Sequence, residues 1–176
     1  MQINTSFASL KSILCAAIIA ATGLLSLGRL SAKEIKLPDA EFAIASVNIP
    51  NGWKPEAVDH GVEAVSADGA IYLSAVAVGS EKGMQAEIDA TFEMLKEHKV
   101  KINESTKKEG KGKINAFETT SLTFKGKDED GPCTISIIFV PIKGKVLIMT
   151  FWYSDEDIEK HAKTMDGILD SLKENS

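Results

Sequence analysis

The residue types that carry catalysis or bind metals are few and scattered in this 176-residue chain. Its three histidines, His60, His98 and His161, lie in separate segments, and none has a second ligand at the spacing of a metal site. Of its two cysteines, only Cys133 lies beyond the N-terminal apolar segment. We therefore expect no metal site and no cofactor, and no motif identifies a catalytic residue.

Two loops approach ligand-binding motifs in composition without matching them. Residues 79–83, GSEKG, precede a predicted helix but have neither the spacing of a phosphate loop nor that of a nucleophile elbow, so a strand-to-helix turn explains them. Residues 128–131, DEDG, lack the alternating oxygen ligands and the distal glutamate of an EF-hand. We expect a solvated loop there, with weak calcium binding as the open alternative.

Two charged segments are the surface features most available to a partner. A basic run carries Lys107, Lys108, Lys111 and Lys113 at the tip of a predicted hairpin, and an acidic loop carries Asp128, Glu129 and Asp130. Protection of a sheet edge and solubility explain the lysines in one interpretation, and docking of an acidic partner explains them in the other. These seven residues form the predicted partner surface.

The N-terminal segment has the features of a secretory signal. Residues 1–32 contain no acidic residue, and Ile13 to Leu27 is mostly apolar, which is shorter than the roughly 20 residues of a membrane span. We expect cleavage near Lys33 and a periplasmic or secreted product, with an uncleaved N-terminal anchor or lipidation at Cys15 as alternatives. No stable membrane span is expected after cleavage.

Residues 33–176 are predicted to form one domain, of a size that supports a core of its own. Loss of Lys11 and Arg29 with the signal takes the formal net charge from −5 to −7. A chain this acidic lacks the clustered basic residues that bind a phosphate backbone, so nucleic acid is excluded as a partner. The sequence does not predict the oligomeric state.

The segment Pro132 to Tyr153 predicts a central hairpin that turns at Lys143-Gly144. Pairing Ile142 with Lys145 makes both faces apolar, so both faces must be covered. We expect Cys133 to be buried and unreactive. Trp152→Ala is predicted to cost on the order of 3 to 5 kcal/mol as a core truncation.

The other predicted elements surround this hairpin. Residues 33–40 are expected to be a polar lead-in, and Trp53 is expected to pack the corner after Pro50-Asn51-Gly52 onto the core. The remaining expectations are a strand at 41–49, a hairpin of 62–66 with 70–78, a helix at 83–99, a hairpin of 101–107 with 113–124, and a terminal helix from Ser154, where Ser154 and Asp157 resemble a capping box.

The predicted fold class is α+β, with an antiparallel β-sheet whose two-sided apolar central hairpin is sandwiched by helices. This order, with FAIASVNIPNGW at 42–53, GKINAFETTSLTF at 112–124 and ILDSL at 168–172, resembles the PsbP-like superfamily, which includes PsbP, Mog, DcrB and LpqN domains. The resemblance implies an antiparallel sheet between helical layers and a non-catalytic binding module. It carries no site residue over to this chain.

Two classes of function follow. The first, favoured, is an exported accessory or binding module that contacts another protein or a hydrophobic segment. The second is a hydrolase-type enzyme using Glu118, His60 or His161, or a small-ligand or lipid-binding protein, with a site formed only in the fold. An acid/base pair in one concave site would favour an enzyme, and an apolar groove without such a pair would favour binding.

Overall fold

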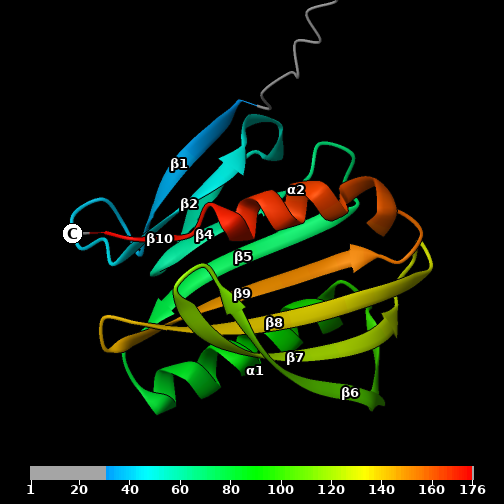
Figure 1. The fold of residues 1–176 in the computed structure, drawn as a ribbon. Helices are drawn as coiled ribbons and strands as arrows, with labels where there is room; N and C mark the ends of the chain where they lie inside the picture. The colour runs from blue at the N-terminus through cyan, green and yellow to red at the C-terminus, as the bar shows by residue number, and fades with distance from the viewer. Residues whose placement is uncertain (1–30, 176) are drawn as a thin grey trace, which may run out of the picture.

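A computed structural model describes residues 31–175. These residues form strands and two α-helices in the order shown in Figure 1. The elements are β1 (Ala32–Leu37), β2 (Ala45–Pro50), the 3-10 helix η1 (Asn51–Trp53), β3 (Glu56–Val58), β4 (Gly61–Val65), β5 (Ile71–Val78), α1 (Glu81–Glu97), β6 (Lys101–Ile114), β7 (Phe117–Lys127), β8 (Pro132–Ile142), β9 (Lys145–Ser154), α2 (Ile158–Asp170) and β10 (Lys173–Glu174).

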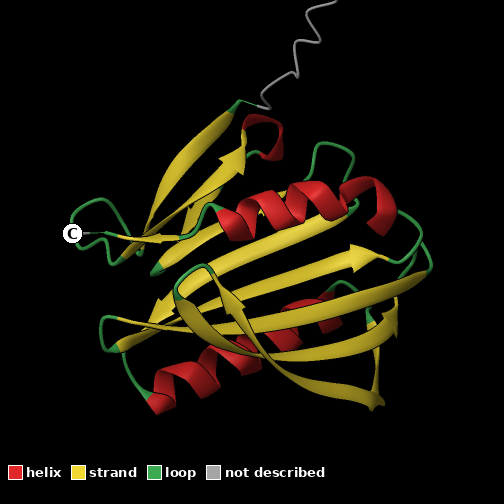
Figure 2. Ribbon diagram, viewed as in Figure 1, coloured by secondary structure: helices red, strands yellow, loops and turns green. Residues whose placement is uncertain are grey.

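The predicted α+β class is confirmed by a large antiparallel sheet with strand order β3-β4-β5-β9-β8-β7-β6. Strands dominate the view in Figure 2, and the hairpin of β8 and β9 lies inside the sheet. Ile142 pairs with Lys145 as predicted. Lys143 and Gly144 both have positive φ, 49° and 73°, which is the backbone that a two-residue hairpin turn requires.

Helix α1 covers one face of the central hairpin. The Ser80 hydroxyl accepts a hydrogen bond from the Gly83 N–H (3.0 Å) and caps the helix N-terminus. Leu95 is fully buried against this face, and Phe92 meets Phe124 of β7 edge to face at 5.6 Å. This core also contains Cys133, Ile135, Ile137, Phe139 and Ile148.

The opposite face is covered by α2 together with a small sheet of order β1-β2-β10, on the far side of the large sheet from α1 (Figure 1). The prediction of a polar lead-in at 33–40 was wrong, because β1 pairs along its length with β2 and buries Leu37. Trp53 is 4% exposed, which confirms its role as an anchor.

Helix α2 begins at Ile158 instead of at Ser154, as the sequence had predicted. Ser154 is the last residue of β9, and its hydroxyl accepts a hydrogen bond from the Glu156 N–H (3.2 Å).

The basic run does not form a hairpin tip, which corrects the sequence prediction. Strand β6 continues through it to Ile114, and the chain turns at Asn115, whose φ is 52°. Gly110 falls between the strands predicted at 101–107 and 113–124, but it is a residue of β6 at which a Cβ would come within 2.6 Å of the Ser121 hydroxyl. The Asn115 side chain donates hydrogen bonds to the carbonyls of Asp170 and Leu172 and ties the true turn to the end of α2.

The signal predicted for residues 1–32 lies almost entirely outside the described residues. Within residues 31–175, no helix combines the length and the apolar character that crossing a membrane would need.

Candidate functional site

One row of side chains across the large sheet passes from a covered region into an open one. Register pairs Phe124 with Ile135, Ile135 with Trp152, Trp152 with Tyr72, and Tyr72 with Val65. Phe124 and Ile135 are buried beneath α1, Trp152 and Tyr72 are half-buried, and Val65 is 44% exposed. Helix α1 therefore leaves the β4–β5 end of this face uncovered.

The uncovered end forms a cleft of about 890 Å³. Its walls come from β3 to β5, the end of β9, the last turn of α1, and the loops that follow β7 and β9. We call this the aromatic cleft, and it is lined by Lys54, Glu56, Glu63, Ala64, Val65, Asp68, Gly69, Ala70, Tyr72, Met94, His98, Asp128, Asp130, Trp152, Ser154, Glu156 and Asp157.

Trp152 lies between two other rings in the aromatic cleft. Its ring centroid is 6.4 Å from that of Tyr72 and 5.6 Å from that of His98, both in tilted arrangements. The sequence predicted Trp152 as a core residue, and it does extend the α1-facing core. Because its side chain also borders the cleft, truncation removes less buried area than a full core substitution would.

Asp128 fixes both Trp152 and the acidic loop. Its Oδ2 accepts a hydrogen bond from Trp152 Nε1 (3.0 Å), and its Oδ1 accepts from the N–H groups of Asp130 and Gly131, both at 3.0 Å. Glu129 points elsewhere and pairs with Lys99 at 2.5 Å. The three residues of the predicted acidic loop therefore separate. Asp128 and Asp130 line the cleft, whereas Glu129 pairs with Lys99, which follows the C-cap of α1.

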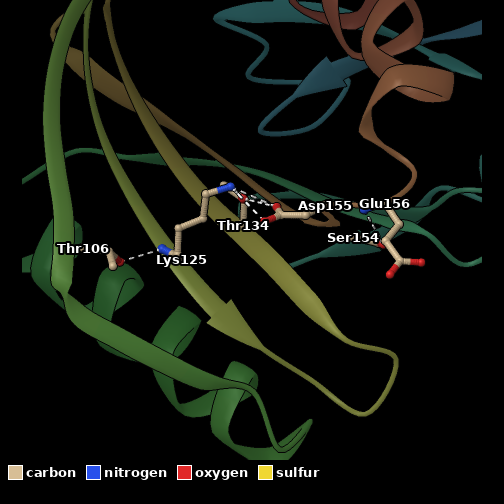
Figure 3. A network of polar contacts seen from close by, with 6 residues as sticks. All are labelled: Thr106, Lys125, Thr134, Ser154, Asp155 and Glu156. Atoms are coloured by element: carbon tan, nitrogen blue, oxygen red, sulfur yellow. Dashed lines mark hydrogen bonds and ion pairs between the residues drawn. The ribbon is translucent and has the colours of Figure 1, made fainter.

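Figure 3 shows the network that holds the loop after β9 in place. Lys125 Nζ donates to the Thr134 hydroxyl (2.7 Å) and to Asp155 Oδ2 (2.9 Å), and Thr134 donates to Asp155 Oδ1 (2.5 Å). Burial would raise the pKa of Asp155, but the Thr134 hydroxyl and the Lys125 ammonium outweigh it, and the pKa is lowered. The loop carries Glu156 and Asp157 to the cleft rim.

The two aromatic donors in the aromatic cleft are already used by its own carboxylates. Tyr72 donates its hydroxyl hydrogen to Glu63 Oε2 (3.1 Å), as Trp152 donates its indole hydrogen to Asp128. Burial, followed by the negative charge of Glu63, raises the pKa of Tyr72 far above its ordinary value, so Tyr72 stays a neutral donor. Apart from Lys54, His98 and Ser154, the polar side chains of the site present acceptors and ring surface to a ligand.

A second polar cluster joins α2 to the β4–β5 turn. Asp68 Oδ2 lies 2.5 Å from Lys160 Nζ and 2.9 Å from His161 Nε2, and Asp68 Oδ1 accepts from the Ser66 hydroxyl (2.8 Å). Lys160 and then Ser66 hold the pKa of Asp68 far below its usual range. His161 also borders a separate hollow of about 370 Å³.

Asp68 and His161 are an acid/base pair in a concave region, the feature that would favour an enzyme. In a hydrolase that used this pair, His161 as the base would have to contact the nucleophile. The nearby Ser66 instead donates its hydroxyl hydrogen to Asp68 and is 4% exposed. Among residues 31–175, no serine, threonine or cysteine forms a hydrogen bond with His161. The pair serves as an attachment point for α2.

The other hydrolase candidates are not brought into this cluster. Glu118 is exposed near the β6–β7 turn, where it lies 3.8 Å from Lys113. His60 lines a third hollow, of about 480 Å³. In the part of the chain that the structure describes, no three His, Cys, Asp or Glu side chains form a metal-binding group.

The predicted basic residues lie on β6, the sheet edge opposite β3. Lys107 pairs with Glu109 at 2.9 Å and Lys113 with Glu118, whereas Lys108 and Lys111 have no ion pair among the described residues.

Cys133 is buried as predicted, and burial, with the charge of Asp128 as a smaller cause, raises the pKa of its thiol to about 11. Sequence reasoning missed Tyr72, Glu63 and His98 as neighbours in one site. The β5–β9 register places Tyr72 beside Trp152, the pairing of β4 with β5 brings Glu63 to Tyr72, and the end of α1 brings His98 to Trp152.

The class that this geometry defines is an α+β domain with a seven-stranded antiparallel sheet, one helix on one face, and a helix with a small sheet on the other. No family model matches the sequence. No curated protein matches it.

A solved structure shares the fold. The solution structure of cyanobacterial PsbP (CyanoP) from Synechocystis aligns with a TM-score of 0.55 and 10% identity, over 85% of this chain and 96% of that one. LpqN, involved in cell envelope biogenesis of Mycobacterium tuberculosis, gives 0.44 and 11% over 75% and 83% of the two chains. The Saccharomyces cerevisiae Ran-binding protein Mog1p gives 0.46 and 9% over 82% and 95%. The fold is PsbP-like, as the resemblance in sequence predicted.

Proposed function

We propose that the protein is an exported, periplasmic binding module that holds a segment of another protein in the aromatic cleft and carries out no catalysis. The observation that carries the proposal is the row of Val65, Tyr72 and Trp152, left accessible in a preformed hollow. Apolar surface gathered in a concave site with a polar rim is typical of recognition sites.

The composition of the cleft suits a protein partner. Tyrosine and tryptophan supply large contact area at little entropic cost and are enriched among the residues that dominate binding energy. Most of its charged residues, among them Glu56, Asp130 and Glu156, are exposed, as in interfaces whose apolar centre is surrounded by polar groups. The hydrogen bonds of Tyr72 and Trp152 hold both rings in place before binding, which lowers the entropy lost on association.

Photo-crosslinking in the living cell tests this proposal. Val65 and Phe42 are the large hydrophobic side chains that the described residues expose, at 44% and 65%, and only Val65 lines the cleft. A photoreactive amino acid at position 65 is expected to form one dominant adduct with another protein, whereas the same group at position 42 is not. Equal adducts at both positions, or none at position 65, would contradict the proposal.

The volume of the cleft supports a second candidate, a small-ligand or lipid-binding protein. About 890 Å³ lies within the range of roughly 300 to 1,000 Å³ that is usual for small-molecule sites. Native mass spectrometry of the protein purified from its own host separates the two candidates. A bound compound of constant mass that is lost on Trp152→Ala would favour the small ligand.

The basic strand edge remains a proposed second contact surface, for an acidic partner. Lys108 and Lys111 stand exposed on β6 without an ion pair among residues 31–175, and the edge strand leaves backbone groups available for pairing. The distance of β6 from β3 in the strand order makes this surface independent of the aromatic cleft.

A further inference from the structure

The charge of the aromatic cleft specifies what its occupant must carry. Seven carboxylates line it against one lysine, Lys54. Within the described residues, Glu56, Asp130, Glu156 and Asp157 form no ion pair with a basic side chain within 4.0 Å. Carboxylates gathered in this way repel one another, and a bound cation relieves the repulsion.

The hydrogen-bonding state of the cleft leads to the same conclusion independently. Tyr72 and Trp152, the aromatic donors that could hold an anionic or carbonyl-rich ligand, already donate to Glu63 and Asp128. The carboxylates that have no basic partner are acceptors, so a ligand that pairs with them must bring its own donors. Ammonium and guanidinium groups bring only donors, and they also bind favourably over the ring faces of tryptophan and tyrosine.

The shape of the site suits an elongated occupant. A smaller hollow of about 260 Å³ between β5 and α1, here the β5–α1 hollow, shares Glu63, Tyr72 and Met94 with the cleft, so the two adjoin. The β5–α1 hollow adds Asp59 and Glu87 and contributes no lysine or arginine. An extended chain can follow both hollows, with apolar positions on the rings and basic positions at the carboxylates.

We propose that the aromatic cleft binds an extended protein segment that carries lysine or arginine side chains among apolar ones. This inference rests on the proposed function and names the chemical class of the partner. Of the residues that line the cleft, Asp128 and Asp130 belong to the partner surface predicted from the sequence.

Three synthetic peptides with one apolar frame test the inference. The first carries lysine at alternate positions, the second has glutamine in place of every lysine, and the third has glutamate. The chain has two tryptophans, and Trp53 is 4% exposed, so a change of emission on titration reports mainly on Trp152 in the cleft. The lysine peptide is expected to bind about tenfold or more tightly than the glutamine peptide, with affinity falling as salt rises, and the glutamate peptide weakest.

A matched pair of triple variants tests whether the preference for lysine comes from the exposed carboxylates of the cleft. Glu56→Gln, Asp130→Asn and Glu156→Gln together should reduce the preference for lysine over glutamine to about threefold or less. Glu41→Gln, Glu104→Gln and Glu159→Gln together remove the same charge from exposed positions outside the cleft and should leave the preference unchanged. Equal loss in both triples would mean that net charge alone attracts the peptide, and it would overturn the inference.

The outcomes separate the inference from the proposed function. If the glutamine peptide or a neutral oligosaccharide changes the Trp152 emission as strongly as the lysine peptide, a cleft ligand exists but its basic character is refuted. If the photo-adduct at position 65 maps to a partner segment without lysine or arginine, the result is the same. If no probe changes the emission and position 65 gives no adduct, both proposals fail.

Discussion

Replacing Asp128 should disturb the aromatic cleft more than any other single change in the loop that follows β7. Its carboxylate accepts three hydrogen bonds at 3.0 Å, two from backbone N–H groups of its own loop and one from Trp152. The loop amides can turn to water when the carboxylate is lost, but the half-buried indole N–H is left with a poorer partner. We expect Asp128→Ala to lower the free energy of unfolding by about 2 kcal/mol.

Thermal unfolding gives the readout, because about 2 kcal/mol corresponds to a decrease in Tm of roughly 4 to 8 °C for a domain of this size. Glu129→Ala is the matched control in the same loop, since it removes an exposed ion pair with Lys99 and should cost under about 1 kcal/mol. Asp128→Asn keeps an oxygen that can accept from the loop amides. A double-mutant cycle of Asp128→Asn with Trp152→Phe therefore isolates the hydrogen bond from the Trp152 indole, and the expected coupling energy is about 1 kcal/mol. Equal Tm values for Asp128→Ala and Glu129→Ala would refute the reasoning.

Four further predictions concern other parts of the molecule. Cys133 should resist a thiol reagent at pH 8 in the folded protein, because burial raises its pKa to about 11; rapid stoichiometric labelling would show otherwise. Asp68→Asn should destabilise the protein at pH 7, and this difference should shrink as pH falls below about 4, because the folded pKa of Asp68 lies below its unfolded value; a difference independent of pH would contradict this. Charge reversal of Lys108 and Lys111 together should leave Tm unchanged but weaken any complex with an acidic partner at β6, which salt-dependent binding would measure. N-terminal sequencing of the protein from its host should begin near Lys33, and a start at the first residue would disprove export with cleavage.

The fold could be predicted where local pattern and burial agree. The hairpin of β8 and β9 is apolar on both faces and turns at Lys143-Gly144, so its register and central place follow from the sequence. Strand β1 could not be predicted in this way, because AKEIKL carries only a few apolar residues and becomes a strand by pairing with β2. The β6–β7 turn was misplaced because the glycines of β6 are more conspicuous turn signals than Asn115.

The candidate site was predictable only in part. Exposure and charge indicated the acidic loop, and Asp128 and Asp130 do line the cleft. The pairing of the aromatic residues could not be predicted from the sequence, because Tyr72 and Trp152 are eighty positions apart and become neighbours only through the order of strands in the sheet. Trp152 was predicted from the sequence as a core residue, and it does extend the core beneath α1, yet how far α1 extends over that face is a property of tertiary packing.

The central claim is that partners bind at the aromatic cleft, and the indole resonances of the two tryptophans test it most directly. In a nitrogen–proton NMR spectrum, Trp152 reports on the cleft through the N–H that it donates to Asp128, and the buried Trp53 on the opposite face serves as an internal reference. On addition of the partner captured at position 65, the Trp152 resonance is predicted to shift while that of Trp53 stays in place. A saturable complex that leaves the Trp152 resonance unchanged would contradict the claim.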